Sequence, residues 1–522
     1  MSVADDRFPR PDEGTRRSDS WVAVGLFFLA LALRVPFRSQ LAYHWDSAEF
    51  ALAIREYNVA LSQPHAPGYF LYVMIGRLVS FFVGDPHASL VWLSVVAGSG
   101  LAALLYVLGL GMFGRRVGLA AALLAMTSPQ VWFHSCVALT YVVDSFLVCL
   151  AVLCCWHARR QGCRWSNAII IGGVLAIIGG VRPQTVPGLL PLAVYAVWAA
   201  GDRRLAKLAL VLCVCAVGTV AWLAPMIRMS GGWSVYTETF HRHQLFNAPS
   251  TFAAGGMDAL LWNIFFMGVY CWNGLILGMV LLGCALLMRL RIEGSRKRDW
   301  DAAHGEALRI LTLWIGPMII MGTAVALTRQ PGYVLNYLPA WIILTAVVAS
   351  ELRKPALYGA VTGSLCLVNA AAFLAWPSQW DGVFLHVGRT AREIRQHDRQ
   401  LAQVVAAIRN GLSPGETVVC HAREYLPLGL RHLQLYLSDF EQYQLTLDPV
   451  MLSPADRPMM SIRGGRLDFV RGPDLAGKRV VALVVPQGTS LEDYTPYFDL
   501  SGAKPLPDSG GSVYTIPVEA LR

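Results

Sequence analysis

The chain has 522 residues, of which 55% are hydrophobic and only 15% carry a charge. Soluble domains usually contain about 25% charged residues, so this composition excludes a soluble protein with a single core. The mean hydropathy of +0.47 favours a protein that crosses a membrane several times. The formal net charge of +9 does not indicate nucleic-acid binding, because the basic residues gather in short loops beside apolar segments, where they set membrane orientation.

Long apolar runs recur along the sequence at lengths near that of a membrane-spanning helix. Most are too long for the strands of a membrane barrel, which need about 10 residues each. The first run follows an acidic tail and has no convincing cleavage site, so we expect an uncleaved first span. The runs lie near residues 21–37, 67–83, 88–113, 117–136, 141–158, 167–181, 184–200, 205–225, 259–289, 307–327, 333–350 and 355–376.

The basic residues indicate which of these runs cross the membrane. If all of them crossed from a cytoplasmic N-terminus, Arg115 and Arg116 would lie outside, against the tendency of basic loops to stay inside. The run 67–83 is short, contains Arg77 and follows a proline-rich start. We therefore predict that this run lies on the outer surface, which leaves about eleven transmembrane helices with every basic cluster on the cytoplasmic side.

This topology divides the chain into three expected parts. Residues 1–20 form a cytoplasmic tail, residues 21–376 an α-helical polytopic transmembrane domain, and residues 377–522 a small C-terminal extracytoplasmic α/β domain. Two long loops, 38–87 and 226–258, fall on the same outer side as the C-terminal domain. The outer side is therefore where we expect the functional site.

The C-terminal part has the pattern of a mixed fold. Thr417–Cys420 and Arg479–Val485 are apolar enough for strands, and Glu393–Ile408 has helical spacing. This pattern predicts a sheet with at least one covering helix.

Two carboxylates, Asp46 and Glu49, stand three residues apart in the first outer loop, before a stretch of helical spacing. We expect an amphipathic helix that lies on the membrane, with Asp46 at its N-terminus. From the spacing alone, Asp46 could simply be the N-cap, with Glu49 completing a capping box.

The next stretch, Gln63-Pro64-His65-Ala66-Pro67-Gly68-Tyr69-Phe70-Leu71-Tyr72, taken with Asp46-Ser47-Ala48-Glu49-Phe50, resembles the first-loop signature of the GT-C glycosyltransferases. This membrane-embedded class includes protein O-mannosyltransferases and lipid A aminoarabinose transferases. The resemblance covers mainly residues 30–160. It implies a GT-C-like helical fold with juxtamembrane helices, and an inverting transfer of sugar from a polyprenyl phosphate to an acceptor hydroxyl.

The resemblance also implies roles for the two carboxylates. Asp46 aligns with the catalytic acid of the class and would act as general base. Several relatives have a second acid directly after the first, whereas this chain has Ser47. The sequence therefore leaves open whether Glu49 assists catalysis, binds the acceptor or only caps the helix.

Other residues at the outer boundary are candidates for substrate binding. Asp144 resembles the second acid of the class, which orients substrate or, in some members, a metal; a helix N-cap is the alternative. Tyr333 resembles the aromatic residue that faces the donor phosphate, and a tyrosine of the membrane interface is the alternative. A leaving phosphate needs fixed cations and donors, and the candidates are Arg242, His243, Arg182, Arg329, His65 and Tyr333.

We predict no metal cofactor, although a divalent metal stays open, because His241 and His243 are poorly spaced for a shared ion. The expected partners are a polyprenyl-phosphate-linked sugar, a glycan, lipid or protein acceptor, and membrane lipids, with no nucleic acid. The expected location is the plasma membrane, as a bacterial inner-membrane protein with a cytoplasmic N-terminus and a periplasmic C-terminal domain. A lipid or solute transporter and an inactive scaffold are the alternatives; a transporter would carry ionisable residues near the bilayer midplane, and these spans have almost none.

Overall fold

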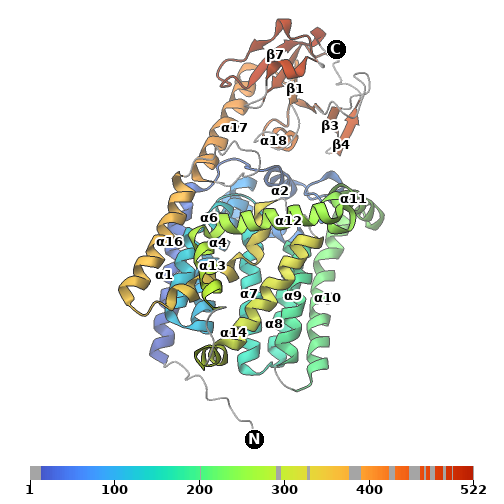
Figure 1. The fold of residues 1–522 in the computed structure, drawn as a ribbon. Coiled ribbons are helices and arrows are strands. Elements are labelled where there is room, and N and C mark those ends of the chain that lie inside the picture. The colour runs from blue at the N-terminus through green and yellow to red at the C-terminus, as the bar shows by residue number, and fades with distance from the viewer. Residues whose placement is uncertain are drawn as a thin grey trace.

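The computed structural model describes residues 13–199, 202–289, 295–325, 330–375, 390–421, 429–445, 459–463, 466–470, 477–485, 490–495 and 498–520. The described chain forms a bundle of helices that carries a sheet domain at one end (Figure 1). The first helix begins at the opposite end of the bundle from the sheet domain.

The bundle contains long helices together with shorter ones that lie across its end. In chain order they are α1 (Glu13–Arg34), α2 (Trp45–Arg55), α3 (Phe70–Val83), α4 (Pro86–Phe113), α5 (Arg115–Thr127), α6 (Pro129–Ser135), α7 (Tyr141–Gln161), α8 (Trp165–Val181), α9 (Val186–Trp198), α10 (Arg204–Met229), α11 (Trp233–Asn247), α12 (Phe252–Leu275), α13 (Leu277–Arg289), α14 (Ser295–Ile320), α15 (Leu338–Ser350) and α16 (Pro355–Ala375). Two short helical segments, η5 (Met321–Val325) and η6 (Pro331–Asn336), precede α15.

Within the described residues, seven helices are long and apolar enough to cross a membrane, judged by length and composition. They span Ser18–Phe37, Pro86–Phe113, Tyr141–Gln161, Arg204–Met229, Phe252–Leu275, His304–Val325 and Pro355–Ala375. Shorter apolar helices, such as α8 and α15, lie among them. A multi-pass helical membrane protein is therefore confirmed, whereas eleven crossings stay a prediction.

Two of the apolar runs are divided where we expected one continuous helix each. The run 259–289 is split into α12 and α13 at Ile276, whose φ of 47° breaks the helix. The run 117–136 is split into α5 and α6 at Pro129, because a proline nitrogen cannot donate the next helical hydrogen bond. In Figure 1, α12 lies across the end of the bundle that faces the sheet domain, while α13 turns into the bundle.

Helix α2 does not lie as an amphipathic helix on a membrane surface. Every residue from Ser47 to Ile54 is buried, so neither face of the helix is polar and solvated. One face packs on the bundle, and α18 (Leu430–Tyr436) of the C-terminal domain packs against the helix as well. Our prediction of an amphipathic surface helix is wrong, because the sequence of the first loop gives no sign of the distant segment that covers it.

The described part of the C-terminal domain contains α17 (Ala391–Gly411), α18 and a sheet of seven strands in the order β4-β3-β2-β1-β5-β7-β6. Strand β1 pairs in parallel with β2 and β5, and the other pairings are antiparallel. The strands are β1 (Thr417–His421), β2 (Glu441–Gln444), β3 (Met459–Arg463), β4 (Arg466–Val470), β5 (Val480–Val484), β6 (Lys504–Pro505) and β7 (Val513–Pro517).

Apolar side chains of β1 and β5 alternate between the two faces of this sheet, as strand geometry requires. Val419 faces a core that includes residues of α17 and α18, while Val418 faces a second core on the other side. The predicted strands at Thr417–Cys420 and Arg479–Val485 and the predicted helix at Glu393–Ile408 are confirmed. The expected boundary between residues 376 and 377 lies outside the described residues.

Candidate active site

Asp46 lies in the first turn of α2 but does not cap the helix. The N-cap is His44, whose Nδ1 accepts a hydrogen bond from the backbone N–H of Asp46 at 3.1 Å. The Asp46 carboxylate, 23% exposed, has its Oδ1 3.6 Å from His44 Nδ1 and 3.9 Å from His65 Nδ1. The capping interpretation of Asp46 is therefore wrong, and its carboxylate is available to a substrate.

Glu49 does not complete a capping box either. Its side chain is 2% exposed, and its Oε1 accepts a hydrogen bond from Trp45 Nε1 at 2.7 Å. Its Oε2 lies 2.5 Å from His65 Nδ1 and also accepts from the backbone N–H of His65 at 3.2 Å. Glu49 therefore holds the His65 ring in place beside Asp46.

The surrounding charges favour the ionised forms of both Asp46 and His65. Burial raises the pKa of the Asp46 carboxyl, but the nearby His44 and His65 outweigh burial, and the pKa falls well below its usual range. Burial lowers the pKa of His65, but Asp46 and Glu49 together raise it to about 9. At neutral pH a carboxylate and an imidazolium therefore stand side by side.

The raised pKa of His65 predicts how the protein responds to alkaline pH. Because the folded pKa of about 9 exceeds the ordinary value near 6.5, the stabilising charge is fully present below about pH 6.5 and is lost as the pH rises through about 9. We expect the thermal unfolding temperature to fall over this range. Thermal scans across pH 6–10 test this, with His65→Gln as control; an equal alkaline loss of stability in the variant would contradict it.

A second polar group centres on Asp144, in the first turn of α7. Asp144 is fully buried, and its Oδ2 accepts a hydrogen bond from Thr185 Oγ1 at 2.7 Å. The same oxygen lies 3.7 Å from Arg182 Nε. Asn336 Nδ2 donates to the Thr185 hydroxyl at 3.1 Å. Through Thr185, Asp144 thus connects the corner between α8 and α9 to η6. Asp144 is not the N-cap of α7, because that position is taken by Thr140.

Arg182 is the central cation of this second group. Its guanidinium carbon lies 4.3 Å from the ring centroid of Tyr141 and 4.6 Å from that of Tyr333, and the side chain is only 2% exposed. The backbone of η6 reaches Tyr141 so closely that a Cβ on Gly332 would lie 2.1 Å from its ring. The field of Arg182 also lowers the pKa of Asp46, so the two groups act on one another.

The structure brings most of the predicted site residues together and leaves others aside. The His243 ring of α11 lies 5.5 Å from the His65 ring, and burial, followed by the charge of His65, lowers the pKa of His243 to about 4. Arg242 is 76% exposed and pairs with Glu238 on the same helix. Arg329 lies outside the described residues. The two adjoining groups contain Asp46, Glu49, His65, His243, Asp144, Arg182 and Tyr333.

Two residues that shape these groups were not among the candidates predicted from the sequence. Tyr141 forms half of the aromatic clamp on Arg182, and its place three residues before Asp144 could have suggested it. Arg431 of α18 is fully buried with its Nε 3.7 Å from Glu49 Oε1. The sequence gives no sign of this contact, because nearly 400 residues separate Arg431 from Glu49.

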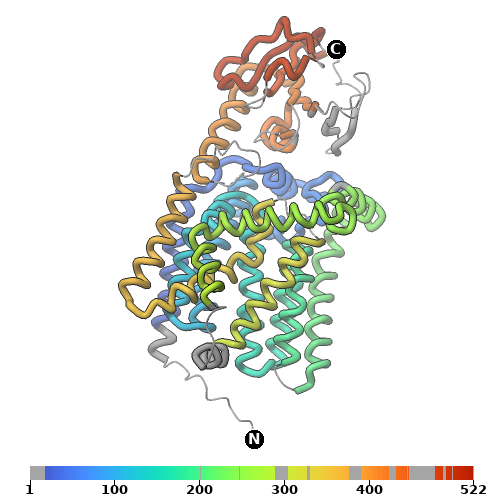
Figure 2. The backbone as a smooth tube through the Cα atoms, viewed as in Figure 1, coloured from blue at the N-terminus to red at the C-terminus, as the bar shows by residue number. Residues whose placement is uncertain are grey.

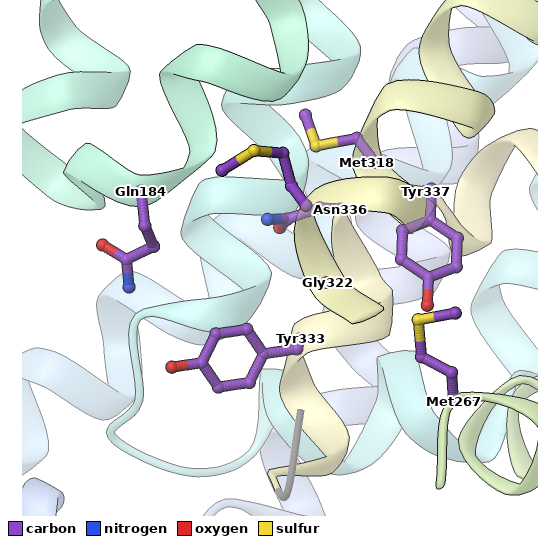
Figure 3. A pocket seen from close by; sticks show the side chains of 8 residues that line it. Gln184, Met267, Met318, Gly322, Tyr333, Asn336 and Tyr337 are labelled. Carbon is purple, nitrogen blue, oxygen red and sulfur yellow. The ribbon is translucent and has the colours of Figure 1, made fainter. Parts of the chain in front are cut away.

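A small pocket adjoins the Arg182 group (Figure 3). Tyr333 and Gln184 lie on one side of it and Tyr337 and Met267 on the other. Methionine side chains give a wall that adapts to irregular apolar ligands. The full lining consists of Gln184, Met267, Met318, Met321, Gly322, Tyr333, Asn336 and Tyr337.

Asp46, Glu49 and His65 offer oxygen and nitrogen atoms within 4.8 Å of one another, a spacing that could hold a metal ion. The surrounding charges fit an ion poorly. His65 is protonated up to about pH 9, so a metal would have to displace its proton. Glu49 already accepts from Trp45 and His65 and faces the buried guanidinium of Arg431.

We therefore expect the sugar transfer that the resemblance implies to survive removal of divalent metals. The purified protein, incubated with EDTA and then passed through a desalting column, should keep at least about half of its rate. The measurement is the transfer rate before chelation, after it, and after adding back Mg²⁺, Mn²⁺ or Zn²⁺ singly. A loss that one of these ions restores would show that the three side chains do hold a metal.

The chain resembles known proteins in both sequence and structure. The profile of the protein O-mannosyl-transferase TMEM260 N-terminal domain matches residues 46–196, a range that includes Asp46, Asp144 and Arg182. The fold is similar to ArnT from Cupriavidus metallidurans in the apo state, with a TM-score of 0.50 and 14% identity over 88% of this chain and 99% of that chain.

The same ArnT bound to undecaprenyl phosphate is also similar, with a TM-score of 0.50 and 13% identity over 90% of this chain and 100% of that chain. Among curated proteins, none is similar enough in sequence to count as a match. The matched domain contains the carboxylates of both polar groups, and the shared fold covers almost the whole of ArnT. The chain therefore has the fold of ArnT, and its residues 46–196 resemble the N-terminal domain of a protein O-mannosyl-transferase, as expected for a membrane glycosyltransferase of the GT-C type.

Proposed function

We propose that this glycosyltransferase moves a sugar from a polyprenyl phosphate to an acceptor hydroxyl with inversion of the anomeric carbon, and that Asp46 is the general base. The observation that carries the proposal is the partly exposed Asp46 carboxylate within the electrostatic reach of the buried Arg182. The Asp46 carboxylate can accept a proton, and the Arg182 guanidinium can stabilise a leaving phosphate. The two components of a sugar transfer thus lie in one site.

The proposed step follows from these two charges. The acceptor O–H gives its proton to Asp46, and its oxygen forms a bond to the anomeric carbon. The bond from that carbon to the phosphate oxygen breaks, and polyprenyl phosphate leaves with the electron pair. Attack from the face opposite the phosphate inverts the configuration. A positioned base contributes about 10²–10⁴-fold to the rate of such a reaction.

The low pKa of Asp46 in the free protein ensures that the carboxylate is ionised, but a weak base has little driving force for proton transfer. An anionic phosphate bound beside Arg182 would cancel part of the positive field that lowers this pKa. Donor binding should therefore make Asp46 a stronger base when the reaction needs it. Because Glu49 keeps the His65 ring beside Asp46, the positive charge of His65 limits how far the pKa of Asp46 rises when the donor binds.

The buried cation and the pocket together suit a phosphate that carries a lipid chain. Arg182 and the hydroxyl of Tyr333 would contact the phosphate, and the methionines beyond Tyr333 would contact the first isoprene units. ArnT, which shares this fold, has been seen with undecaprenyl phosphate bound. Asp144 would act indirectly by fixing Arg182. We place the main phosphate contact at Arg182 and keep Arg242 and His243 as contacts at the rim, while Arg329 stays a candidate from the sequence alone.

The proposed site faces the outer side of the membrane. A cytoplasmic N-terminus would put the basic loops inside and the C-terminal domain in the periplasm of a bacterium, with the chain in the inner membrane. The acceptor would then be a glycan, lipid or protein on that side. Domain limits of 1–20, 21–376 and 377–522 belong to the same proposal.

The proposal is tested with the purified full chain in liposomes. Given a lipid extract that contains glycosyl-phosphoryl polyprenols and a cell-envelope extract as acceptor, the protein should release polyprenyl phosphate, as measured by mass spectrometry. Release that requires sugar nucleotides would contradict the lipid donor. Movement of the intact lipid across the membrane without loss of its sugar would instead indicate a transporter.

A further inference from the structure

The C-terminal domain contacts the proposed catalytic loop through α18. This short helix lies against α2 at the end of the bundle, where α11 and α12 also lie (Figures 1 and 2). The approach is close, because a Cβ on Gly429 would lie 2.7 Å from the Trp45 ring. The domain that starts more than 330 residues after Asp46 therefore forms one wall of the site.

Arg431 is the charged residue of this contact, and it is fully buried. Its Nε lies 3.7 Å from Glu49 Oε1, and its Nη2 donates to the carbonyl of Leu61 at 2.6 Å. Its Nη1 donates to Gln434 Oε1 at 2.6 Å, which orients the guanidinium. Arg431 thus holds two points of the first loop, Glu49 and Leu61. Glu49 in turn contacts His65.

Other contacts attach the domain without touching Glu49. The Tyr436 hydroxyl accepts from the backbone N–H of Ala42 at 2.8 Å, and His432 Nε2 donates to the carbonyl of Ala42 at 3.0 Å. The carboxylate of Asp398 accepts from the backbone N–H groups of Gln40 and Leu41. Docking of the domain therefore does not depend on Arg431 alone.

These contacts form a chain from the C-terminal domain to the proposed base. Arg431 faces Glu49, Glu49 holds both the backbone and the ring of His65, and His65 stands 3.9 Å from the carboxylate of Asp46. We infer that Arg431 is a positioning residue for sugar transfer: it holds the Glu49 side chain in the orientation that keeps the His65 ring beside Asp46. This inference rests on the proposed function, because Arg431 can help to position the base only if Asp46 is that base.

The test compares full-length variants that separate the charge of Arg431 from docking. Arg431→Met removes the charge, Arg431→Gln removes it but keeps hydrogen-bond donors, and Tyr436→Phe weakens docking only.

The first readout is the titration midpoint of His65, measured by deuterium exchange at its imidazole C2 position. The titratable and charged groups that face this ring are Asp46, Glu49, Arg182, His243 and Tyr69. The second readout is the donor lipid that accumulates in cells.

Loss of the guanidinium leaves His65 as the main cation beside Glu49, so proton loss from His65 becomes harder. We expect Arg431→Met to raise the His65 midpoint by at least half a pH unit and to increase the donor lipid at least tenfold. Tyr436→Phe should change the midpoint by less than 0.2 units and the lipid by less than twofold. If Arg431→Met is not recovered as a folded protein, Arg431→Gln provides the same comparison.

The two readouts also separate this inference from the proposed function. If Asp46→Asn causes no donor lipid to accumulate, the proposed function fails, while the His65 titration still reports whether Arg431 acts on that ring. A His65 midpoint that is the same in the Arg431 variants, in Tyr436→Phe and in the unchanged protein would overturn the inference. So would normal donor use by the Arg431 variants when Asp46→Asn blocks it.

Discussion

Replacing Asp46 by asparagine is expected to lower sugar transfer by about 10²–10⁴-fold, the usual contribution of a positioned base. Asparagine has nearly the same shape as aspartate but cannot take a proton from the acceptor. The measurement is the transfer rate of purified Asp46→Asn in liposomes, compared with the unchanged protein at the same donor concentration.

The protein should stay folded in this variant. Asp46 is 23% exposed, its backbone N–H keeps the cap with His44, and Glu49 still pairs with His65. We therefore expect the free energy of unfolding to fall by only about 1 kcal/mol. An equal rate in the variant would contradict the assignment of the base, and a lost rate with a large loss of thermal stability would leave Asp46 as a structural residue instead.

Replacing Arg182 by methionine is expected to affect both folding and chemistry. The change leaves the buried Asp144 without its cation, and breaking such a pair costs about 3–5 kcal/mol of stability. It also removes the proposed partner of the leaving phosphate, a kind of interaction whose loss costs about 10²–10³-fold in rate. Thermal unfolding in detergent and transfer rates in liposomes measure the two effects separately.

The double variant Arg182→Met with Asp144→Asn distinguishes these two roles. Neutral side chains at both positions remove the unpaired buried charge, so most of the lost stability should return. Transfer should stay as low as in the single variant, because no cation faces the phosphate. Recovery of the rate together with the stability would show that Arg182 matters only for packing between Tyr141 and Tyr333.

The sequence was informative wherever local pattern decides structure. Membrane-spanning helices were visible because a run of apolar residues is itself the requirement for crossing a bilayer, and the strand at Thr417–Cys420 was visible from its continuous apolar run. The breaks at Pro129 and Ile276 were harder, because the apolar character continues across each of them. Hydropathy records the length of an apolar segment, not whether one helix or two occupies it.

The site was predictable only in part, for a related reason. Asp144 and Arg182 each stand near an end of an apolar segment, Asp46 lies in the loop after the first such segment, and the three positions meet in space. The N-cap of α2 could not be read from spacing, since His44 takes the place that Asp46 could have filled. Arg431 reaches Glu49 only through the docking of a distant domain, and such a contact leaves no pattern near either residue.

The measurement that most directly tests the account is a comparison of membrane lipids from cells in which Asp46→Asn replaces the unchanged protein. If Asp46 is the base of a transfer from a lipid carrier, a polyprenyl phosphate carrying a sugar accumulates in the variant cells, and its mass identifies the sugar. Identical lipid profiles, with the variant present in the membrane at normal level, would contradict the lipid donor or the role of Asp46 in its use.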